Sequence, residues 1–255
     1  MGDLHTANPT CNARVLDFAE TIKATGDFDS AWRAYNAAMA RLGFSSCTYA
    51  FWVGREAEGD ADDIKVISSH PPDWMRRYEA HGYANHDPTV KHCILYDGEP
   101  ILWHRMQNPA IRTAFSTRFE QLAAAAGLGL GVTFPLRDAN LSSIGGIGLA
   151  ANGMGAQELE TLVAERRDEL WTMANMFHAL AQSPPALRQI FPLSDREREC
   201  LLWASAGLST KETAHRIGLA DKTVEHHVKR ACVRLNARNR THAVSRAILF
   251  GLIEP

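Results

Sequence analysis

Hydrophobic positions in the last quarter of the chain recur at helical spacing and are interrupted at defined points. An apolar run, Cys200–Trp203, follows Ser194 and Glu197, whose spacing is that of a capping box at the start of a helix. Gly207 stands where this helix would end, because glycine adopts the left-handed conformation of a helix C-terminus without strain. The pattern therefore predicts a capped helix in this segment.

A second capping box, formed by Ser209 and Glu212, begins a shorter helix that ends at Gly218. A third helix is expected from about Asp221, because apolar residues return there at helical spacing. A short helix, a turn that contains glycine and a longer helix together make the helix-turn-helix pattern. The apolar positions of the third helix are Val224, Val228, Ala231, Val233 and Leu235.

The remaining face of the expected third helix carries many hydrogen-bond donors. A run of charge is by itself typical of a solvated surface, but on this helix of this motif it favours contact with DNA. Glu225 would accept from cytosine N4, and Lys229 would donate to guanine. We expect phosphate contacts from Lys222, Thr223 and Arg240, base contacts from Glu225, His226 and Lys229, and further donors in Arg230, Arg234 and Arg238.

Upstream of residue 183 the pattern alternates between helical and strand periodicity. Pro184 and Pro185 interrupt it, so residues 183–191 are expected to be a linker between domains 1–182 and 192–255. Helices outside a sheet built from hairpins and short crossovers indicate an α+β domain, an α/β/α sandwich. Helices are expected at 14–25, 29–42, 73–81, 109–126 and 156–182, and strands at 45–53, 64–69, 131–136 and 144–150, the last two joined by a turn at 138–140.

Charge is distributed unevenly along the 255 residues. Residues 1–189 hold 16 basic and 22 acidic side chains, whereas residues 190–255 hold 11 and 7, so the net charge of -2 combines -6 with +4. The positive excess lies in the segment that is expected to bind DNA.

The cysteines are odd in number, scattered, and without the Cys-x-x-Cys spacing of metal sites. We therefore expect no disulfide, no metal and no cofactor. The first residues lack the basic flank and apolar core of a secretory signal, and no apolar run approaches membrane-spanning length. A cytoplasmic protein that does not enter a membrane is expected. The cysteines are Cys11, Cys47, Cys93, Cys200 and Cys232.

A second set of candidate functional residues lies between residues 68 and 103. Trp74 and Tyr78 are four residues apart and so share one face of the expected helix. If Asp87 is buried it needs donors, because a buried carboxylate without them is very unfavourable. With Trp103 these residues describe a cavity for a small amphiphile that carries an N–H group. A hydrophobic core with a capping Asp explains the same residues, so both interpretations stay open.

The C-terminal segment resembles the DNA-binding domain of the LuxR family of bacterial transcription regulators. The resemblance covers about the last quarter of the chain and implies an all-α domain of four helices, in which the fourth helix, about 240–250, often helps dimerise. Ala220 departs from the family, which often has a capping Ser there; losing a cap costs about 1 kcal/mol. The matching positions are Leu193, Ser194, Arg196, Glu197, Gly207, Lys211, Glu212, Ala214, Thr223, Val224, His227, Leu235, Thr241 and Ala243.

The upstream residues resemble the autoinducer-binding domain of the same family's quorum-sensing receptors. This resemblance implies a five-stranded antiparallel sheet and a small-molecule ligand, an N-acyl homoserine lactone. Trp74 would donate to the lactone carbonyl, Asp87 would accept from the ligand amide, and Gly131 would permit a close approach of strands. Tyr78 and Trp103 would form walls. The six signature positions are Trp74, Tyr78, Asp87, Pro88, Trp103 and Gly131, and all six match in order.

Two departures bear on the identity of the ligand. His70 stands where many relatives have a Tyr that bonds the acyl carbonyl, and Gly148 stands where relatives often have Thr or Ser. The hypothesis is an unusual acyl group, branched or aryl, or weaker selectivity. In the alternative, Ser142, Ser143 or Tyr49 supplies the missing donor, and the sequence does not decide between the two.

Other classes of protein fit less well. His92 beside Cys93 is not a nucleophile pair, since adjacent residues do not face each other on a helix or a strand, so we expect no enzyme. A response regulator would need an acidic pair after its first strand, which residues 1–50 lack. The resemblance implies a homodimer on an inverted repeat of double-stranded DNA, with RNA polymerase a further candidate partner. The alternative is a regulator that responds to a non-lactone molecule or needs none.

Overall fold

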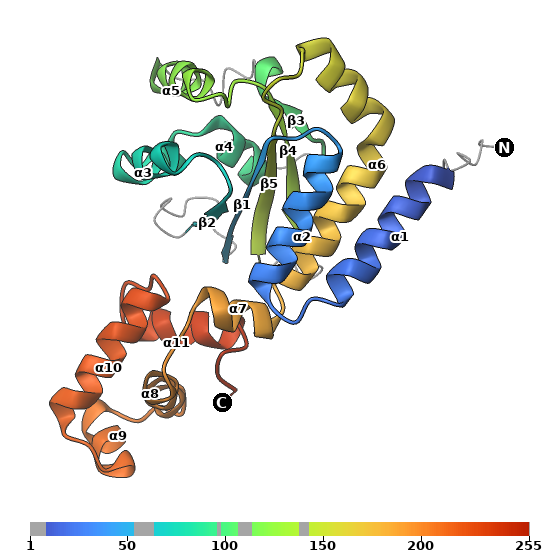
Figure 1. Cartoon of the computed structure of the whole chain (residues 1–255). Helices are drawn as coiled ribbons and strands as arrows, with labels where there is room; N and C mark the ends of the chain where they lie inside the picture. Colours follow the sequence, from blue (N-terminus) through green and yellow to red (C-terminus); the bar gives the residue numbers. More distant parts are fainter. Residues whose placement is uncertain (1–8, 54–63, 96–97, 107–113, 138–142, 255) are drawn as a thin grey trace. The chain divides into compact units, whose positions relative to one another are not determined.

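The structure is a computed structural model that describes residues 9–53, 64–95, 98–106, 114–137 and 143–254. The chain divides into two compact units, Met1–Ala179 and Leu180–Pro255 (Figure 1). The turn expected at 138–140 and the first part of the helix expected at 109–126 lie outside the described residues.

The first unit is built on a five-stranded sheet. Its strands are β1 (Ser46–Val53), β2 (Lys65–Ser68), β3 (Ile101–Leu102), β4 (Gly131–Arg137) and β5 (Ser143–Ala150). They lie in the order β2-β1-β5-β4-β3, and every neighbouring pair is antiparallel. The five-stranded antiparallel sheet that the family resemblance implies is therefore confirmed.

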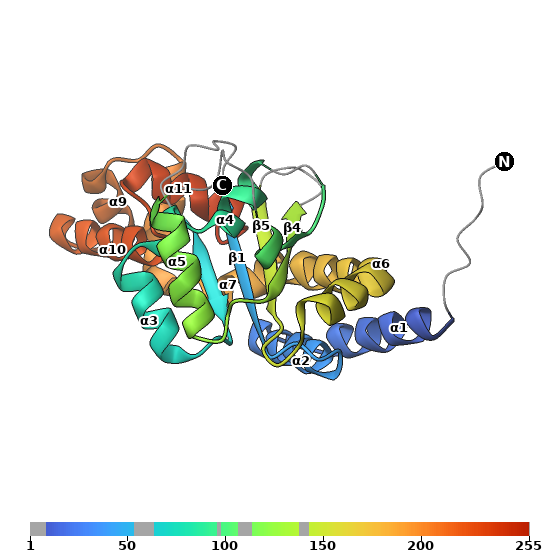
Figure 2. The same ribbon diagram turned by 90° about the horizontal axis from the view of Figure 1, so that it is seen from above.

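Helices cover both faces of this sheet (Figures 1 and 2). On one face lie α1 (Pro9–Lys23), α2 (Phe28–Arg41) and α6 (Ala156–Ala181). On the other face lie α3 (Pro72–Ala80), α4 (Pro88–Leu95) and α5 (Ala114–Ala125). The predicted sandwich is thus confirmed, and most predicted elements agree with the observed ones to within a few residues.

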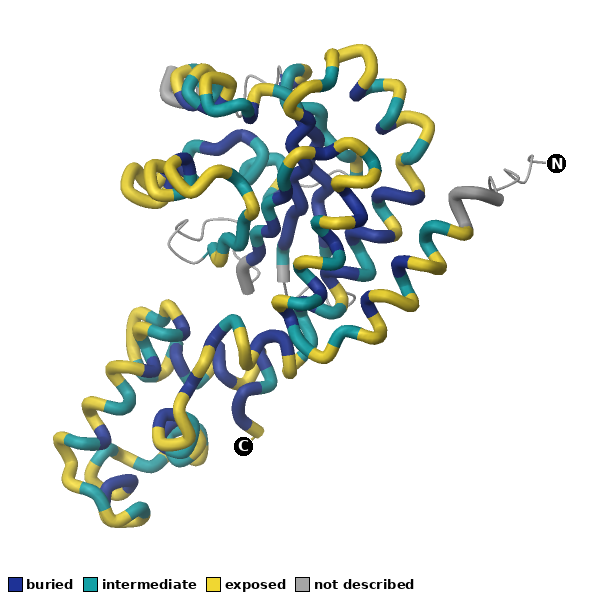
Figure 3. The backbone as a smooth tube through the Cα atoms, viewed as in Figure 1, coloured by how far each residue is buried: buried dark blue, intermediate teal, exposed yellow. Residues whose placement is uncertain are grey.

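Alternation along β1 gives neighbouring residues opposite surroundings. Tyr49 and Phe51 are fully buried on the α2 and α6 side, where the Tyr49 ring lies 5.2 Å from that of Phe177 between centroids. Thr48 and Ala50 face the α3, α4 and α5 side and line a cavity there. Figure 3 shows the same division, with buried strands at the centre of the unit and exposed outer surfaces on its helices.

Several short elements of this unit are absent from the sequence prediction. β3 has only two residues, too few for a detectable alternation. α4 has eight residues and begins at Pro88, where proline at the first helical position was the available signal. A single turn of 3-10 helix, η3 (Trp103–Arg105), follows β3 directly and was also not predicted.

The second unit is all helical. It contains α7 (Pro184–Ile190), α8 (Asp195–Ser205), α9 (Thr210–Ile217), α10 (Asp221–Arg234) and α11 (Arg240–Leu249). Both predicted capping boxes are formed, by Ser194 with Glu197 and by Ser209 with Glu212. Gly207 and Gly218 have φ of +87° and +68°, the left-handed conformation expected of them.

The segment predicted as a linker contains a helix instead. Pro184 and Pro185 occupy the first turn of α7, where their missing N–H groups break no helical bond. Leu187 is buried, and the ring of Phe191 stacks on Phe250 with centroids 4.6 Å apart. Residues 184–191 therefore pack within the second unit, because proline starts a helix as readily as it ends one.

Candidate functional site

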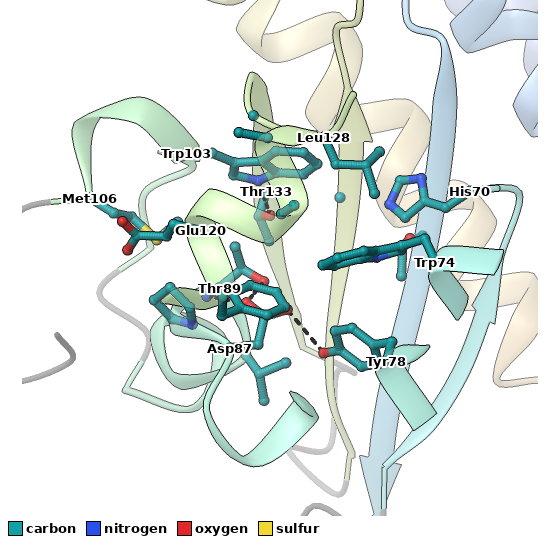
Figure 4. Close-up of a pocket in the computed structure, with 18 of the residues that line it drawn as sticks. His70, Trp74, Tyr78, Asp87, Thr89, Trp103, Met106, Glu120, Leu128 and Thr133 are labelled. Carbon is teal, nitrogen blue, oxygen red and sulfur yellow. Dashed lines mark hydrogen bonds between the residues drawn. The ribbon is translucent and has the colours of Figure 1, made fainter. Parts of the chain in front are cut away.

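A cavity of about 420 Å³ lies between the sheet and the layer of α3, α4 and α5 (Figure 4). Its size falls within the range of small-molecule sites, and its walls are mostly aromatic and aliphatic with a few polar groups. Six of the eight ligand residues predicted from the sequence line it: His70, Trp74, Tyr78, Asp87, Trp103 and Gly148.

Asp87 is the polar centre of the cavity. Its Oδ2 accepts from Tyr78 Oη at 2.9 Å, and its Oδ1 accepts from the backbone N–H and hydroxyl of Thr89 at 2.8 and 2.7 Å. Burial raises the pKa of Asp87, and the hydrogen bonds from Thr89 and Tyr78 oppose that rise. Because a carboxylate oxygen accepts two hydrogen bonds, Oδ2 keeps room for one further donor.

Trp74 belongs to a cluster of aromatic rings beside Asp87. Its ring centroid lies 5.6 Å from that of Phe119 on α5 and 6.3 Å from that of Tyr78, one turn away on α3. Trp74 Nε1 forms no hydrogen bond with any described residue, yet it is not sealed from the cavity. An indole N–H is a donor only, so it is available to an acceptor on a bound molecule.

Trp103 is held against the sheet by two contacts. Its Nε1 donates to Thr133 Oγ1 at 2.8 Å. A Cβ atom at Gly131 would lie 2.6 Å from the Trp103 ring and 2.5 Å from the backbone oxygen of Leu149, so only glycine fits there. Gly131 does not itself line the cavity, and what it permits is the close approach of Trp103 and of the neighbouring strand.

The glycines of β5 shape the floor of the cavity unequally. A Cβ at Gly148 would meet Trp103 at 3.4 Å and Thr133 Oγ1 at 3.6 Å, which are ordinary contacts. A Cβ at Gly146 would lie 2.5 Å from the sulfur of Cys93, which already fills that space. Gly148 therefore leaves a small notch that a side chain would fill.

His70 lies at the end of β2 with its ring beside Trp74 (Figure 4). Its Nδ1 is 2.6 Å from Ser46 Oγ, while its Nε2 has no partner among the described residues. Burial lowers the pKa of His70 to about 4, so the ring is neutral near pH 7. It therefore offers a neutral nitrogen at the cavity wall.

Tyr49 does not belong to this site, and its assignment from the sequence was wrong. It lies on the opposite face of the sheet, where Oη is 2.8 Å from Nδ1 of His178 on α6. Alternate residues of β1 face opposite sides of the sheet, and Thr48 and Ala50 are the ones that face the cavity. Ser142 lies outside the described residues, and the side chain of Ser143 does too.

Several polar cavity residues were missed by the sequence analysis. Thr89 had a local signal, since an Asp commonly accepts from the backbone two residues later. Thr133 had none, because its place opposite Trp103 depends on the pairing of β3 with β4. The missed residues that line the cavity include Thr48, Thr89, Cys93, His104, Met106, Glu120, Leu128 and Thr133.

His92 and Cys93 do not act together. His92 Nε2 is 2.8 Å from the backbone oxygen of Glu99, outside the cavity. Cys93 lies inside the cavity, where burial raises the pKa of its thiol to about 12. Such a thiol is protonated at neutral pH and is a poor nucleophile.

The polar face of α10 is a second candidate site. Lys222, Glu225, His226 and Lys229 are exposed, as is Arg230. Val233, one of the apolar positions of the predicted helix, is 75% exposed, so it does not belong to the buried face. It lies about 200° around the helix from Ala231, which is buried.

Three arginines predicted for this face have partners inside the second unit. Arg234 donates to Glu197 and to the backbone oxygen of Pro192, each at 2.7 Å, so it fastens α10 to the start of α8. Arg230 Nε lies 3.4 Å from the same Glu197 and stays half exposed. Arg240 donates to the backbone oxygen of Leu208. Fewer of the predicted donor side chains are therefore available to contact DNA than the sequence indicated.

Two kinds of feature do not occur in the described part of the chain. No helix in it has the length and apolarity needed to cross a bilayer. No cluster of three or more His, Cys, Asp or Glu side chains suited to a metal ion occurs in it.

Family models match both units. The autoinducer binding domain matches residues 27–181, and the model described as bacterial regulatory proteins, luxR family, matches residues 191–247. Among curated proteins, the transcriptional activator SolR of Ralstonia nicotianae is 31% identical over 229 residues, covering 87% of this chain and 91% of its own. The transcriptional activator LuxR of Aliivibrio fischeri is 27% identical over 206 residues, covering 75% and 76%.

Solved structures share the fold. CepR2 of Burkholderia cenocepacia, described as N-acylhomoserine lactone dependent, matches 67% of this chain and 94% of its own with a TM-score of 0.54 and 23% identity. SdiA in complex with octanoyl-rac-glycerol matches 100% and 99% with a TM-score of 0.56 and 18% identity.

Proposed function

We propose a ligand and a mechanism for this chain from one premise, that it belongs to the LuxR family of bacterial regulators and joins an autoinducer-binding domain to a helix-turn-helix. The proposed ligand is an N-acyl homoserine lactone. The observation that carries the proposal is a buried Asp87 with one free acceptor position, beside the available indole N–H of Trp74.

The ligand amide N–H would donate to Asp87 Oδ2, a hydrogen bond to a charged acceptor worth about 1.5–3 kcal/mol. Trp74 Nε1 would donate to the lactone carbonyl. Thr133 accepts from Trp103, so its own hydroxyl proton remains available to donate to the acyl carbonyl. The neutral ring of His70 could donate to the same carbonyl from Nε2 when its Nδ1 accepts from Ser46. Each buried methylene of the acyl chain would add about 0.8 kcal/mol.

The notch at Gly148 supports a substituted acyl group rather than a replacement donor. Tyr49, one of the residues considered as that donor, bonds His178 on the far face of the sheet. Thr48 and Thr133 lie nearest the notch after Trp103, so a branch or ring there would meet hydroxyl and apolar groups together. A Gly148→Ala variant is expected to discriminate against the bulkiest acyl groups first.

The output of the protein would be control of DNA binding. A homodimer would place two α10 helices in successive major grooves of an inverted repeat, about one helical turn apart. Glu225, His226 and Lys229 would contact bases, and Lys222 and Thr223 would contact phosphates. Arg230 lies in an ion pair with Glu197 and Arg240 donates to the backbone oxygen of Leu208, so each would have to leave that contact to reach a phosphate, and their contribution is expected to be smaller.

Ligand binding would act by mass action. A molecule that completes the core of the first unit binds the folded chain and not the unfolded one, so it raises the melting temperature with concentration. The same event would change the population of the DNA-competent arrangement.

The test is thermal unfolding of the full-length protein with a panel of acyl homoserine lactones and with octanoyl glycerol. Asp87→Asn should abolish the rise in melting temperature that a lactone produces. Asp73→Asn is the matched control, because Asp73 is exposed on α3, lies away from the cavity lining and forms an ion pair with Arg76. A folded protein that binds DNA but responds to octanoyl glycerol alone, or to no compound, would reject the lactone and favour a non-lactone or ligand-independent regulator.

A further inference from the structure

The sheet forms the floor of the cavity, and the character of this floor changes along the strands. Gly148 on β5 pairs with Thr48 on β1 and with Thr133 on β4, so one row across the sheet carries two hydroxyl groups. The neighbouring row on the same face lies two residues away, about 7 Å along the strands, and is apolar. It consists of Val66, Ala50, Gly146 and Pro135.

The wall that α4 contributes also changes from polar to apolar. Thr89, whose N–H and hydroxyl both donate to Asp87, lies beside the carboxylate proposed to bind the ligand amide. Cys93 lies four residues later, about 6 Å further along the same face of α4, and both residues line the cavity. A Cβ added to Gly146 would lie 2.5 Å from the sulfur of Cys93. The apolar end of this wall therefore meets the apolar row of the floor.

The junction of α4 and β5 is tightly packed and held in place. Only the sulfur of Cys93 occupies the space above Gly146, because the Cβ of Cys93 would lie at an ordinary contact distance of 3.7 Å from the added Cβ. Arg137 at the end of β4 donates from Nη2 to the backbone oxygens of Cys93 and Ile94, at 2.7 and 3.3 Å. These bonds fasten the last turn of α4 to the sheet, so the sulfur is a fixed part of the cavity wall.

We propose that Cys93 limits the length of the acyl chain and so determines which lactone the cavity selects. The chain runs from the amide at Asp87 along α4 and over the apolar row, and its end meets the sulfur above Gly146. The inference rests on the proposed function, because it assigns the far end of the same ligand. An acyl chain gains affinity only while each added methylene is buried, and a methylene that meets a fixed wall is overpacked.

The experiment measures, by calorimetry on the full-length protein, the affinity for unsubstituted acyl homoserine lactones from butanoyl to tetradecanoyl. In the wild type the affinity should rise about fourfold with each added methylene up to one optimal length and then fall. Cys93→Ala should move this optimum to a longer chain, by about one methylene, because it empties the space of the sulfur. The butanoyl compound should be too short to reach Cys93 and should bind both proteins equally. An unchanged optimum would overturn the assignment.

A second substitution rebuilds the wall from the opposite side. Adding Gly146→Ala to the Cys93→Ala variant places a methyl group in the space that the sulfur occupied, 3.7 Å from the Cβ atom of position 93. The optimal chain length should then return toward that of the wild type. If the double variant still binds the butanoyl compound but keeps the longer optimum, the shift comes from a loosened α4 rather than from a length limit, and the proposal is rejected.

Cys47→Ala is the matched control for the loss of a buried sulfur in the same unit. Cys47 is buried on β1 and, being adjacent to Thr48, faces the opposite side of the sheet, so the optimum should not move. Equal shifts in the two single cysteine variants would reject the role of Cys93. Lactone binding that requires Asp87 but has the same optimum in the wild type and Cys93→Ala would reject this inference alone. No lactone binding at all would reject the proposed function and this inference with it.

Discussion

Two of the buried carboxylates, Glu197 in the second unit and Asp87 in the first, are satisfied by different kinds of partner. Glu197 in the second unit has a side chain 1% exposed, and it pairs with the guanidinium of Arg234 at 2.7 Å. Asp87 in the first unit accepts its hydrogen bonds from Tyr78 and Thr89, which carry no charge, and burial raises its pKa. One charge is balanced within the chain, and the other is not.

The difference distinguishes a framework from a receptor. A carboxylate paired with the chain's own cations has its partners once the chain has folded. A carboxylate held only by neutral donors has a buried charge that no cation balances. A further hydrogen-bond donor from a bound molecule would lower the free energy of that charge. Under the proposed function, Glu197 therefore belongs to the framework that holds the helix-turn-helix together, whereas Asp87 would gain its missing donor from a ligand.

The largest expected effect is on the paired carboxylate. Glu197→Ala removes the partner of two arginines and the acceptor for the backbone N–H of Ser194, so the second unit should lose about 3 kcal/mol of stability. Urea unfolding of the full-length protein measures this loss. Glu199→Ala, on an exposed ion pair of the same helix, should change stability by less than about 1 kcal/mol. Equal losses would mean that Glu197 is no special framework residue.

The next effect concerns the dependence of stability on pH in the first unit. The folded-state pKa of His70 is about 4, below the unfolded value of 6.5, so the folded chain binds fewer protons between these values. Stability is therefore lost as the pH falls from about 6.5 to 4, by about 3 kcal/mol in total. Unfolding of the wild type and His70→Gln across this window should show a steeper decline in the wild type. Parallel curves would contradict the assignment.

Substitution of Asp87, the carboxylate without a cationic partner, should have a much smaller effect on stability than substitution of Glu197. The folded pKa of Asp87 is raised, so its contribution to stability is present below the unfolded pKa and is lost as the pH rises through the folded pKa. At neutral pH, Asp87→Asn should therefore change the stability of the ligand-free protein by no more than about 1 kcal/mol. A loss as large as that of Glu197→Ala, measured by the same urea titration, would remove the distinction between the two carboxylates.

The two units also differ in how far the sequence predicts them. The helix boundaries of the second unit follow from bonds between residues three apart, such as Ser194 with Glu197 and Ser209 with Glu212, so local patterns suffice. The prolines at 184 and 185 misled the interpretation because their effect on a helix depends on which end they occupy.

The cavity could be predicted only in part. The spacing of Trp74, Tyr78 and Asp87, with the family resemblance, identified residues that the fold does bring together. The partners that set their chemistry come from elements distant in sequence: Thr133 lies 30 residues beyond Trp103. Tyr49 shows the limit, because a strand pattern gives alternation but not which face meets the cavity.

The smallest expected effect is a gain in stability of the second unit from a change at the N-cap of α10. Ala220 caps α10 without a side-chain bond, and its φ and ψ of -75° and 148° are close to the -67° and 167° of the capping Ser209.

Ala220→Ser should therefore accept from the backbone N–H of Thr223 without strain, adding about 0.5–1 kcal/mol. The gain should stay below that of a full capping box, because Thr223 supplies no Glu side chain to return the bond. Ala220→Val, which has no acceptor, is the control. The melting transition of the second unit should rise in the serine variant while the ligand-induced shift of the first unit stays constant. A change in that shift would mean that the start of α10 and the cavity are energetically coupled, and that the second unit is not the independent framework described above.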